Sequence, residues 1–176
     1  MKIVGFIMRS DMGTFSNTEY LVKKAYKRMW LVRRLKGLGA STSQLVDALQ
    51  KQVLSVLWLG APAWFCQITD QERKDIDRVA KVGLRIIFGR FYCGFENALL
   101  VAQMRKPTKQ LAGMTERFAA KAASSNKFSK WFQPERKKTI DTRNSKNSQK
   151  YENVPARTAR YGQSPIPHLT NIINSK

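Results

Sequence analysis

Lysine and arginine recur at short intervals in two segments of this chain, where their spacing suits the chemistry of binding an anion. One segment runs from residue 23 to 34 and the other from 74 to 85. Ammonium and guanidinium groups bind phosphate oxygens, so a row of them on one side of a helix predicts contact with a phosphate backbone. The side chains predicted to bind nucleic acid are Lys23, Lys24, Lys27, Arg28, Arg34, Lys74, Arg78, Lys81 and Arg85.

The whole chain shares this positive charge. Its 176 residues include 32 Lys and Arg against 12 Asp and Glu, which gives a net charge of +20 and a pI near 10.4. Such an excess repels itself unless a polyanion neutralises it, and the usual polyanions are nucleic acids and acidic membrane surfaces. The charge therefore favours nucleic-acid binding, and a solvated surface without a partner is the plain alternative. The hydrophobic fraction of 43% is sufficient for one folded domain.

Carboxylates offer the other candidate chemistry, but their pattern does not favour catalysis. Asp70, Asp75 and Asp77 lie close together in the sequence, yet they fall in the early turns of a predicted helix, where acids are ordinary stabilisers. A site for a hard cation needs converging oxygens rather than one helix face, and no two aspartates are adjacent anywhere in the chain. We therefore expect no metal site.

Cysteine and histidine are too scarce for a usual zinc site. Cys66 and Cys93 form no C-x-x-C pattern, and His168 is the only histidine. Two buried free thiols in a reducing compartment are expected instead. The chain also lacks a P-loop, a dinucleotide-binding glycine motif and a nucleophile elbow, so we expect no cofactor and no enzymatic activity.

The second basic segment lies on the clearest amphipathic helix of the sequence. Thr69 and Glu72 form a T-x-x-E capping box that predicts the start of this helix, and Gly89 predicts its end. At helical spacing the basic residues gather on one side. The opposite, apolar side carries Ile76, Val79, Ala80, Val82, Leu84, Ile86 and Ile87.

The first basic segment is predicted to lie on a helix running from a capping box at Ser16 and Glu19 to about Gly37. Like charges three and four residues apart destabilise a helix by a few tenths of a kcal/mol per pair, so a bound phosphate backbone would offset their repulsion. The apolar face of this helix is predicted to consist of Val22, Ala25, Tyr26, Met29, Trp30 and Val32.

Further helices are expected around these two. A third capping box, Ser41 with Gln44, leads into an apolar helix over residues 45–58, the predicted centre of the bundle. Pro62 is expected to bend or end it, with Trp64 and Phe65 in the core. Shorter helices are predicted over 95–104 and 107–123, and a strand over 2–8.

The predicted fold class is mainly α, a small helical bundle with one short N-terminal strand and a disordered basic C-terminal tail. We expect a strand and loop in residues 1–12 and the bundle in 13–132. Residues 133–163 are rich in Lys, Arg, Asn, Ser and Thr, and the segment 133–176 is predicted to be a basic, largely disordered tail with a docking segment at 161–173. No apolar run is long enough to span a bilayer or to serve as a signal peptide, so we expect an intracellular protein, cytoplasmic or nuclear, that binds no membrane.

Several short motifs in sequence order resemble one known family. They are V-L-W-L-G-A-P-A-W (56–64), I-T-D-Q-E-R-K-D-I-D-R-V (68–79), L-R-I-I-F-G-R-F-Y (84–92), E-N-A-L (96–99) and a closing segment that contains S-P-I-P (154–170). Together they resemble the region downstream of the catalytic palm in reverse transcriptases of non-LTR retrotransposons, such as the jockey and CR1 elements. The resemblance covers nearly the whole chain.

The resemblance implies a thumb and post-thumb region of an RNA-directed DNA polymerase. In that family the segment 2–8 would be the last palm strand, Asp11 and Met12 would lie in the loop to the thumb, and the Y-x-D-D type catalytic motif would lie upstream of Met1. A thumb of this kind holds the backbone of the template–primer duplex. The resemblance therefore implies a non-catalytic nucleic-acid-binding fragment, with a separate reverse transcriptase palm as a candidate partner.

Three other functions remain open from the sequence. The chain is alternatively a stand-alone basic protein that binds RNA or DNA outside reverse transcription. A second alternative is a helical module that docks another protein through exposed apolar surface. A third is a relic without a selected role.

Overall fold

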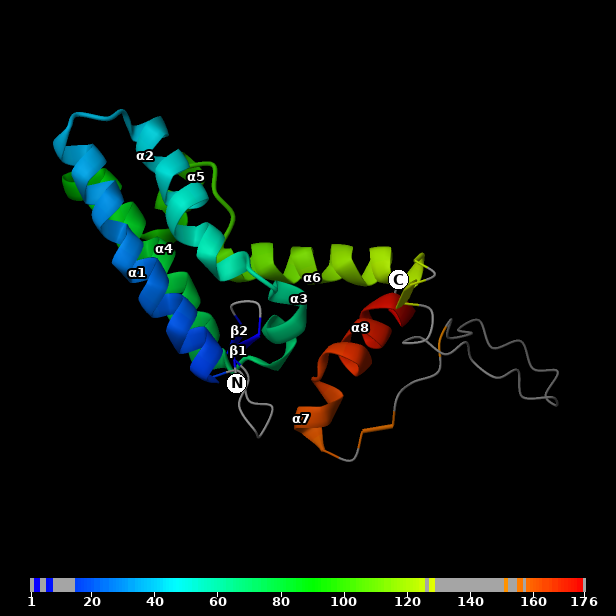
Figure 1. Ribbon diagram of the computed structural model, residues 1–176. Coiled ribbons are helices and arrows are strands. Elements are labelled where there is room, and N and C mark those ends of the chain that lie inside the picture. The colour runs from blue at the N-terminus through cyan, green and yellow to red at the C-terminus, as the bar shows by residue number, and fades with distance from the viewer. Residues whose placement is uncertain are drawn as a thin grey trace, which may run out of the picture. The chain divides into compact units, whose positions relative to one another are not determined.

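The computed structural model of the chain describes residues 2–3, 6–7, 15–125, 127–128, 151, 155–156 and 158–175, and this part is mainly helical, as predicted (Figure 1). The chain divides into two compact units. Unit 1 comprises Met1–Ala61 and Ile68–Ala112, and unit 2 comprises Pro62–Gln67 and Gly113–Lys176. The helices that carry both basic segments belong to unit 1.

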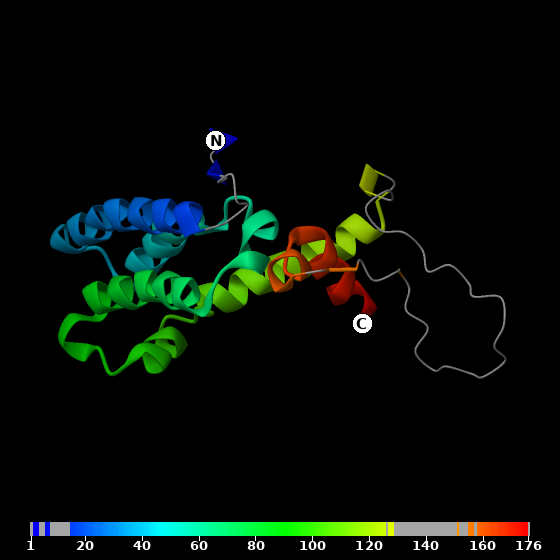
Figure 2. The ribbon, with the colours of Figure 1, turned by 90° about the horizontal axis from the view of Figure 1, so that it is seen from below.

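The longest helices of unit 1, α1 (Phe15–Gly37) and α4 (Asp70–Phe88), lie side by side and run in the same direction (Figures 1 and 2). Lys36 near the end of α1 donates hydrogen bonds to the carbonyl oxygens of Ile86 and Ile87 in α4, the latter at 3.1 Å. A cation at the last carbonyls of a helix complements its dipole, so Lys36 fixes the two C-terminal ends together.

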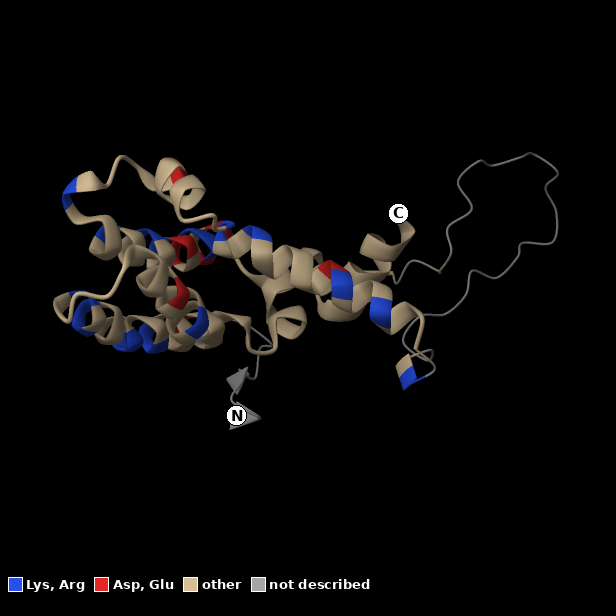
Figure 3. Ribbon diagram, turned by 90° about the horizontal axis from the view of Figure 1, so that it is seen from above, with Lys and Arg blue, Asp and Glu red and all other residues tan. Residues whose placement is uncertain are grey.

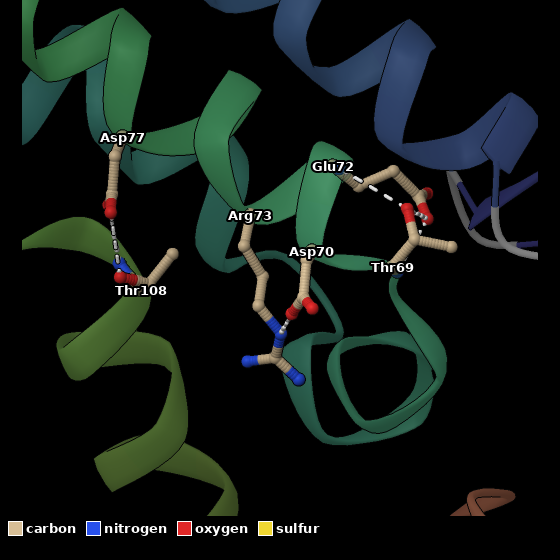
Figure 4. Close-up of polar contacts among 6 residues, drawn as sticks. All are labelled: Thr69, Asp70, Glu72, Arg73, Asp77 and Thr108. Atoms are coloured by element: carbon tan, nitrogen blue, oxygen red, sulfur yellow. Dashed lines mark hydrogen bonds and ion pairs between the residues drawn. The ribbon is translucent and has the colours of Figure 1, made fainter.

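Two of the three predicted capping boxes are confirmed. The Thr69 hydroxyl accepts from the backbone N–H of Glu72, and the Glu72 carboxylate accepts from the backbone N–H of Thr69 at 2.8 Å (Figure 4). Ser41 and Gln44 make the same reciprocal pair. The side chain of Ser16 lies outside the described residues, so the remaining box stays a prediction.

The prediction of one regular α-helix over residues 45–58 is wrong. The segment begins as α2 (Thr42–Ala48), widens into the π-helix η1 (Leu49–Val53) and tightens into the 3₁₀-helix η2 (Leu54–Trp58). Packing accounts for the change, because η1 and η2 contact α1 and their apolar side chains are held in the core. Leu49, Val53, Leu54 and Leu57 are fully buried here, as are Ala25, Met29 and Val32 of α1 and Ile76, Val79 and Leu84 of α4.

The N-terminal strand also differs from its prediction. Instead of one strand over 2–8, two strands of two residues, β1 (Lys2–Ile3) and β2 (Phe6–Ile7), pair antiparallel, with Lys2 opposite Ile7. The two segments therefore supply each other's hydrogen-bond partners, which a single strand would have needed from a larger sheet. In addition, β2 contacts α1.

Two further helices of the predicted set are present. The helix α5 (Phe95–Val101) ends three residues earlier than predicted, and α6 (Pro107–Ala123) has its predicted bounds. A short 3₁₀-turn, η4 (Gly89–Phe91), follows α4, with Gly89 at a φ of 52° as its predicted role at a helix end requires. Asp77 of α4 accepts hydrogen bonds from the backbone N–H and the hydroxyl of Thr108, at 3.1 and 3.0 Å, and so caps the start of α6 (Figure 4).

Unit 2 has its own small core. Ala119, Ala122 and Leu169 are buried there. Leu169 belongs to α8 (Pro165–Asn174), which follows the short α7 (Ala159–Gly162). The Asn174 amide and the Tyr151 backbone exchange two hydrogen bonds of 2.9 and 3.1 Å. The side chains packed around this core are Phe118, Phe128, Tyr151, Ile172 and Ile173.

The predicted docking segment 161–173 comprises the end of α7, residues 163–164 and most of α8. Of the predicted tail 133–176, residues 133–150, 152–154, 157 and 176 lie outside the described residues. Unit 2 also contains η3 (Phe65–Gln67) and, from Pro62 onward, the short helix α3 (Ala61–Trp64). Trp64 and Phe65 are buried, as predicted. None of the described helices combines the length and hydropathy that crossing a membrane requires.

Candidate nucleic-acid interface

The candidate interface is the outer side of the α1–α4 pair, where Lys and Arg recur along both helices (Figure 3). Hydrophobic residues hold the two helices together from within, so their charged sides are left to solvent. Of the nine side chains predicted to bind nucleic acid, Lys24 is half-buried and the other eight are exposed.

On α4 the four predicted cations form one stripe. Lys74, Arg78, Lys81 and Arg85 follow at intervals of four, three and four residues, which places them on one side of a helix. The Arg85 guanidinium also lies over the ring of Tyr92, with its central carbon 5.2 Å from the ring centre. This cation–π contact holds one end of the stripe in place.

On α1 the predicted cations divide into two groups. Lys23, Lys27 and Arg34 are exposed at spacings of four and seven residues and point away from the core. Lys23 pairs with Glu19 at 2.7 Å, an exposed contact worth only a few tenths of a kcal/mol that a phosphate can displace.

Arg28 and Lys24 form the second group of α1 cations, and they lie on a different side of the helix from Lys23, Lys27 and Arg34. The Arg28 guanidinium donates to the carbonyl oxygen of Gln52 in η1 at 2.9 Å, so its orientation is set by the α1–η1 contact. The Lys24 ammonium lies 5.7 Å from the ring centre of Tyr20. Because each lies two residues from Tyr26, both project to nearly the opposite side of α1 from that tyrosine.

Tyr26 marks where α1 meets α4 at the surface. Partial burial raises the pKa of Tyr26 above its usual value of 10.0, while the nearby Arg78 guanidinium lowers it and the Asp75 carboxylate raises it. These influences place the Tyr26 hydroxyl beside the charged stripe of α4. Because α1 and α4 contact each other, Arg78 of the α4 stripe lies near the Tyr26 side of α1.

Two aromatic residues of α1 depart from their predicted place in the core. Tyr26 and Trp30 are 36% and 62% exposed, respectively. The apolar stripe predicted on α1 was too wide, because the buried hydrophobic residues of this helix are Leu21, Ala25, Met29 and Val32. Tyr26 and Trp30 instead lie among the cations.

Two basic residues were missed by the sequence argument. Arg33 is exposed and lies three residues after Trp30 and seven after Tyr26, on the same side of α1. Lys36 binds the end of α4. Helical spacing from Trp30 would have found Arg33, whereas nothing local in the sequence indicates the partner of Lys36. We define the basic surface as Lys23, Lys27, Arg33 and Arg34 of α1 with Lys74, Arg78, Lys81 and Arg85 of α4.

The acidic residues of α4 have structural partners. Asp70 lies 3.8 Å from Arg73, and Asp77 caps α6 (Figure 4). Among the described residues, no three His, Cys, Asp or Glu side chains come together as metal ligands would. Of the two thiols predicted to be buried, Cys66 is buried, but Cys93 is exposed because it lies in the turn between η4 and α5.

Comparisons with protein-family models, with curated proteins and with solved structures found no significant match to this chain.

Proposed function

We propose that the chain binds the sugar-phosphate backbone of nucleic acid through the basic surface. The observation that carries this proposal is the packing of α1 against α4 with eight exposed Lys and Arg side chains on their outer sides. Binding of this kind depends on charge rather than on base sequence, and it weakens as salt replaces the counterions that binding releases.

The biological setting that we propose is reverse transcription. The motifs of residues 56–99 resemble the thumb region of non-LTR retrotransposon reverse transcriptases, whose thumb holds a template–primer duplex. In this setting the chain is a non-catalytic, nucleic-acid-binding part of an RNA-directed DNA polymerase, and its protein partner is a reverse transcriptase palm. The basic surface would hold the duplex backbone while the palm performs the chemistry.

Charge reversal within α4 tests the proposed binding. Arg78→Glu with Lys81→Glu removes two exposed cations from the basic surface. We expect the affinity for a DNA duplex to fall and the slope of log affinity against log salt to decrease by about 2, close to 0.9 per lost phosphate contact. Fluorescence anisotropy with a labelled duplex across a range of salt concentrations measures both quantities.

The matched control is Arg117→Glu with Lys121→Glu in α6. These two residues are also exposed and helical, but they belong to unit 2 and lie outside the basic surface. The control changes net charge by the same amount but leaves the basic surface intact. It should therefore alter the salt slope far less. Equal losses in the two variants would show that total charge, not the α1–α4 surface, governs binding, and the proposal would fail.

A further inference from the structure

Tyr26 and Trp30 form an exposed aromatic pair inside the basic surface. They lie four residues apart on α1, so their side chains are neighbours on one side of the helix, with Cβ atoms about 6 Å apart. Trp30 leaves 62% of its surface in water. Cations lie around the pair, with Arg33 following on the same side of α1 and Arg78 of α4 acting on the Tyr26 hydroxyl.

Phosphate binding by itself requires no aromatic groups. Lys and Arg supply the attraction for a backbone, whereas an indole or a phenol ring offers a flat apolar face that matches the face of a base. In a duplex the base faces are stacked on one another and are inaccessible to such rings. Aromatic side chains among phosphate-binding cations are therefore suited to strands whose bases are unpaired.

We propose that the basic surface binds single-stranded nucleic acid, with unpaired bases stacking on Trp30 and Tyr26 while the surrounding cations bind the phosphates. This inference rests on the proposed function and adds a substrate class to it. Duplex binding and single-strand binding are compatible at a junction where a duplex continues into a single strand. There the cations would bind the phosphates of both parts, and the aromatic rings would stack only on bases of the single strand.

Substitution of Trp30 separates stacking from charge. With the full chain and a thymidine single strand of about 12 nucleotides, we expect Trp30→Ala to lower affinity about 5- to 150-fold, the range for losing one stacked base. Affinity for a duplex of equal length should change less than about twofold, and the salt slope on the single strand should stay that of the wild type, because no cation is lost. Trp30→Phe should keep most of the affinity, because its ring still stacks.

Two controls keep this test decisive. Tyr161→Ala removes another exposed aromatic side chain, from α7 in unit 2, and should leave single-strand affinity unchanged. Arg78→Glu with Lys81→Glu should weaken both substrates. If the charge variant weakens binding but Trp30→Ala affects single strand and duplex alike, the stacking inference is overturned and the proposed function stands. If the charge variant has no effect, the proposed function itself is overturned.

Discussion

Gly83 lies in the middle of α4, where a glycine ordinarily weakens a helix, and its neighbour explains its presence. A Cβ atom built on Gly83 would lie 2.8 Å from Cδ2 of Leu49 and closer still to Cδ1. Leu49 is fully buried at the start of the π-helix η1. The missing side chain at Gly83 thus allows η1 to approach α4. The sequence shows a glycine inside an amphipathic helix, but it does not show what approaches it.

Replacing this glycine should reduce stability despite the better helix propensity of alanine. We expect Gly83→Ala to lower the free energy of unfolding by about 1 kcal/mol, since overpacking of about 1–3 kcal/mol outweighs a propensity gain of about 1 kcal/mol. Gly113→Ala in α6 is the matched control, because nothing lies within 4 Å of its added Cβ, and it should stabilise by up to about 1 kcal/mol. Urea denaturation measures the free energy of unfolding of both variants. A stabilisation by Gly83→Ala equal to that of the control would show that Leu49 has room to move.

Elements were predictable to the extent that their signals are local. The T-x-x-E and S-x-x-Q boxes fix the starts of α4 and α2, and Pro107 starts α6, because each cap involves residues within one turn. The change from α to π to 3₁₀ geometry over residues 42–58 was not predictable, because it depends on contacts with α1 and α4 from elsewhere in the chain. The exposure of Tyr26 and Trp30 was missed for the same reason.

The α1–α4 contact can be tested through the ionisation of Tyr26. Since Arg78 lowers its pKa and Asp75 raises it, Arg78→Gln should raise the pKa of Tyr26 further and Asp75→Asn should lower it. A pH titration of the ring signals by NMR measures both shifts. Arg117→Gln in unit 2 should leave the pKa unchanged. If neither α4 variant moved it, Tyr26 would not lie beside α4.

The same raised pKa has a consequence for stability. The folded chain holds the phenolic proton of Tyr26 more tightly than the unfolded chain does. Its contribution to stability is therefore fully present below the usual pKa of 10.0 and is lost as the pH rises through the folded value. Chemical denaturation between pH 8 and about 11 should show a smaller alkaline loss in Tyr26→Phe than in the wild type.

At the scale of the whole molecule, a net charge of +20 indicates an anionic partner but does not say where it binds. Seven of the nine predicted cations belong to the basic surface, whereas Arg28 and Lys24 turn toward Gln52 and Tyr20. Helical spacing was enough to find the stripe of α4. The separation on α1 required the structure, because the partner of Arg28 is Gln52 in η1, 24 residues further along the chain.

The most direct test of this account is the salt dependence of nucleic-acid binding when the two helices are altered separately and together. Lys27→Glu with Arg34→Glu changes α1, and Arg78→Glu with Lys81→Glu changes α4. If the helices form one binding surface, each pair should lower the salt slope by about 2, the four changes together by about 4, and the wild type should bind one short duplex per chain. If the α1 variant kept the wild-type salt slope, or if each chain bound two duplexes independently, the two helices would not form one binding surface.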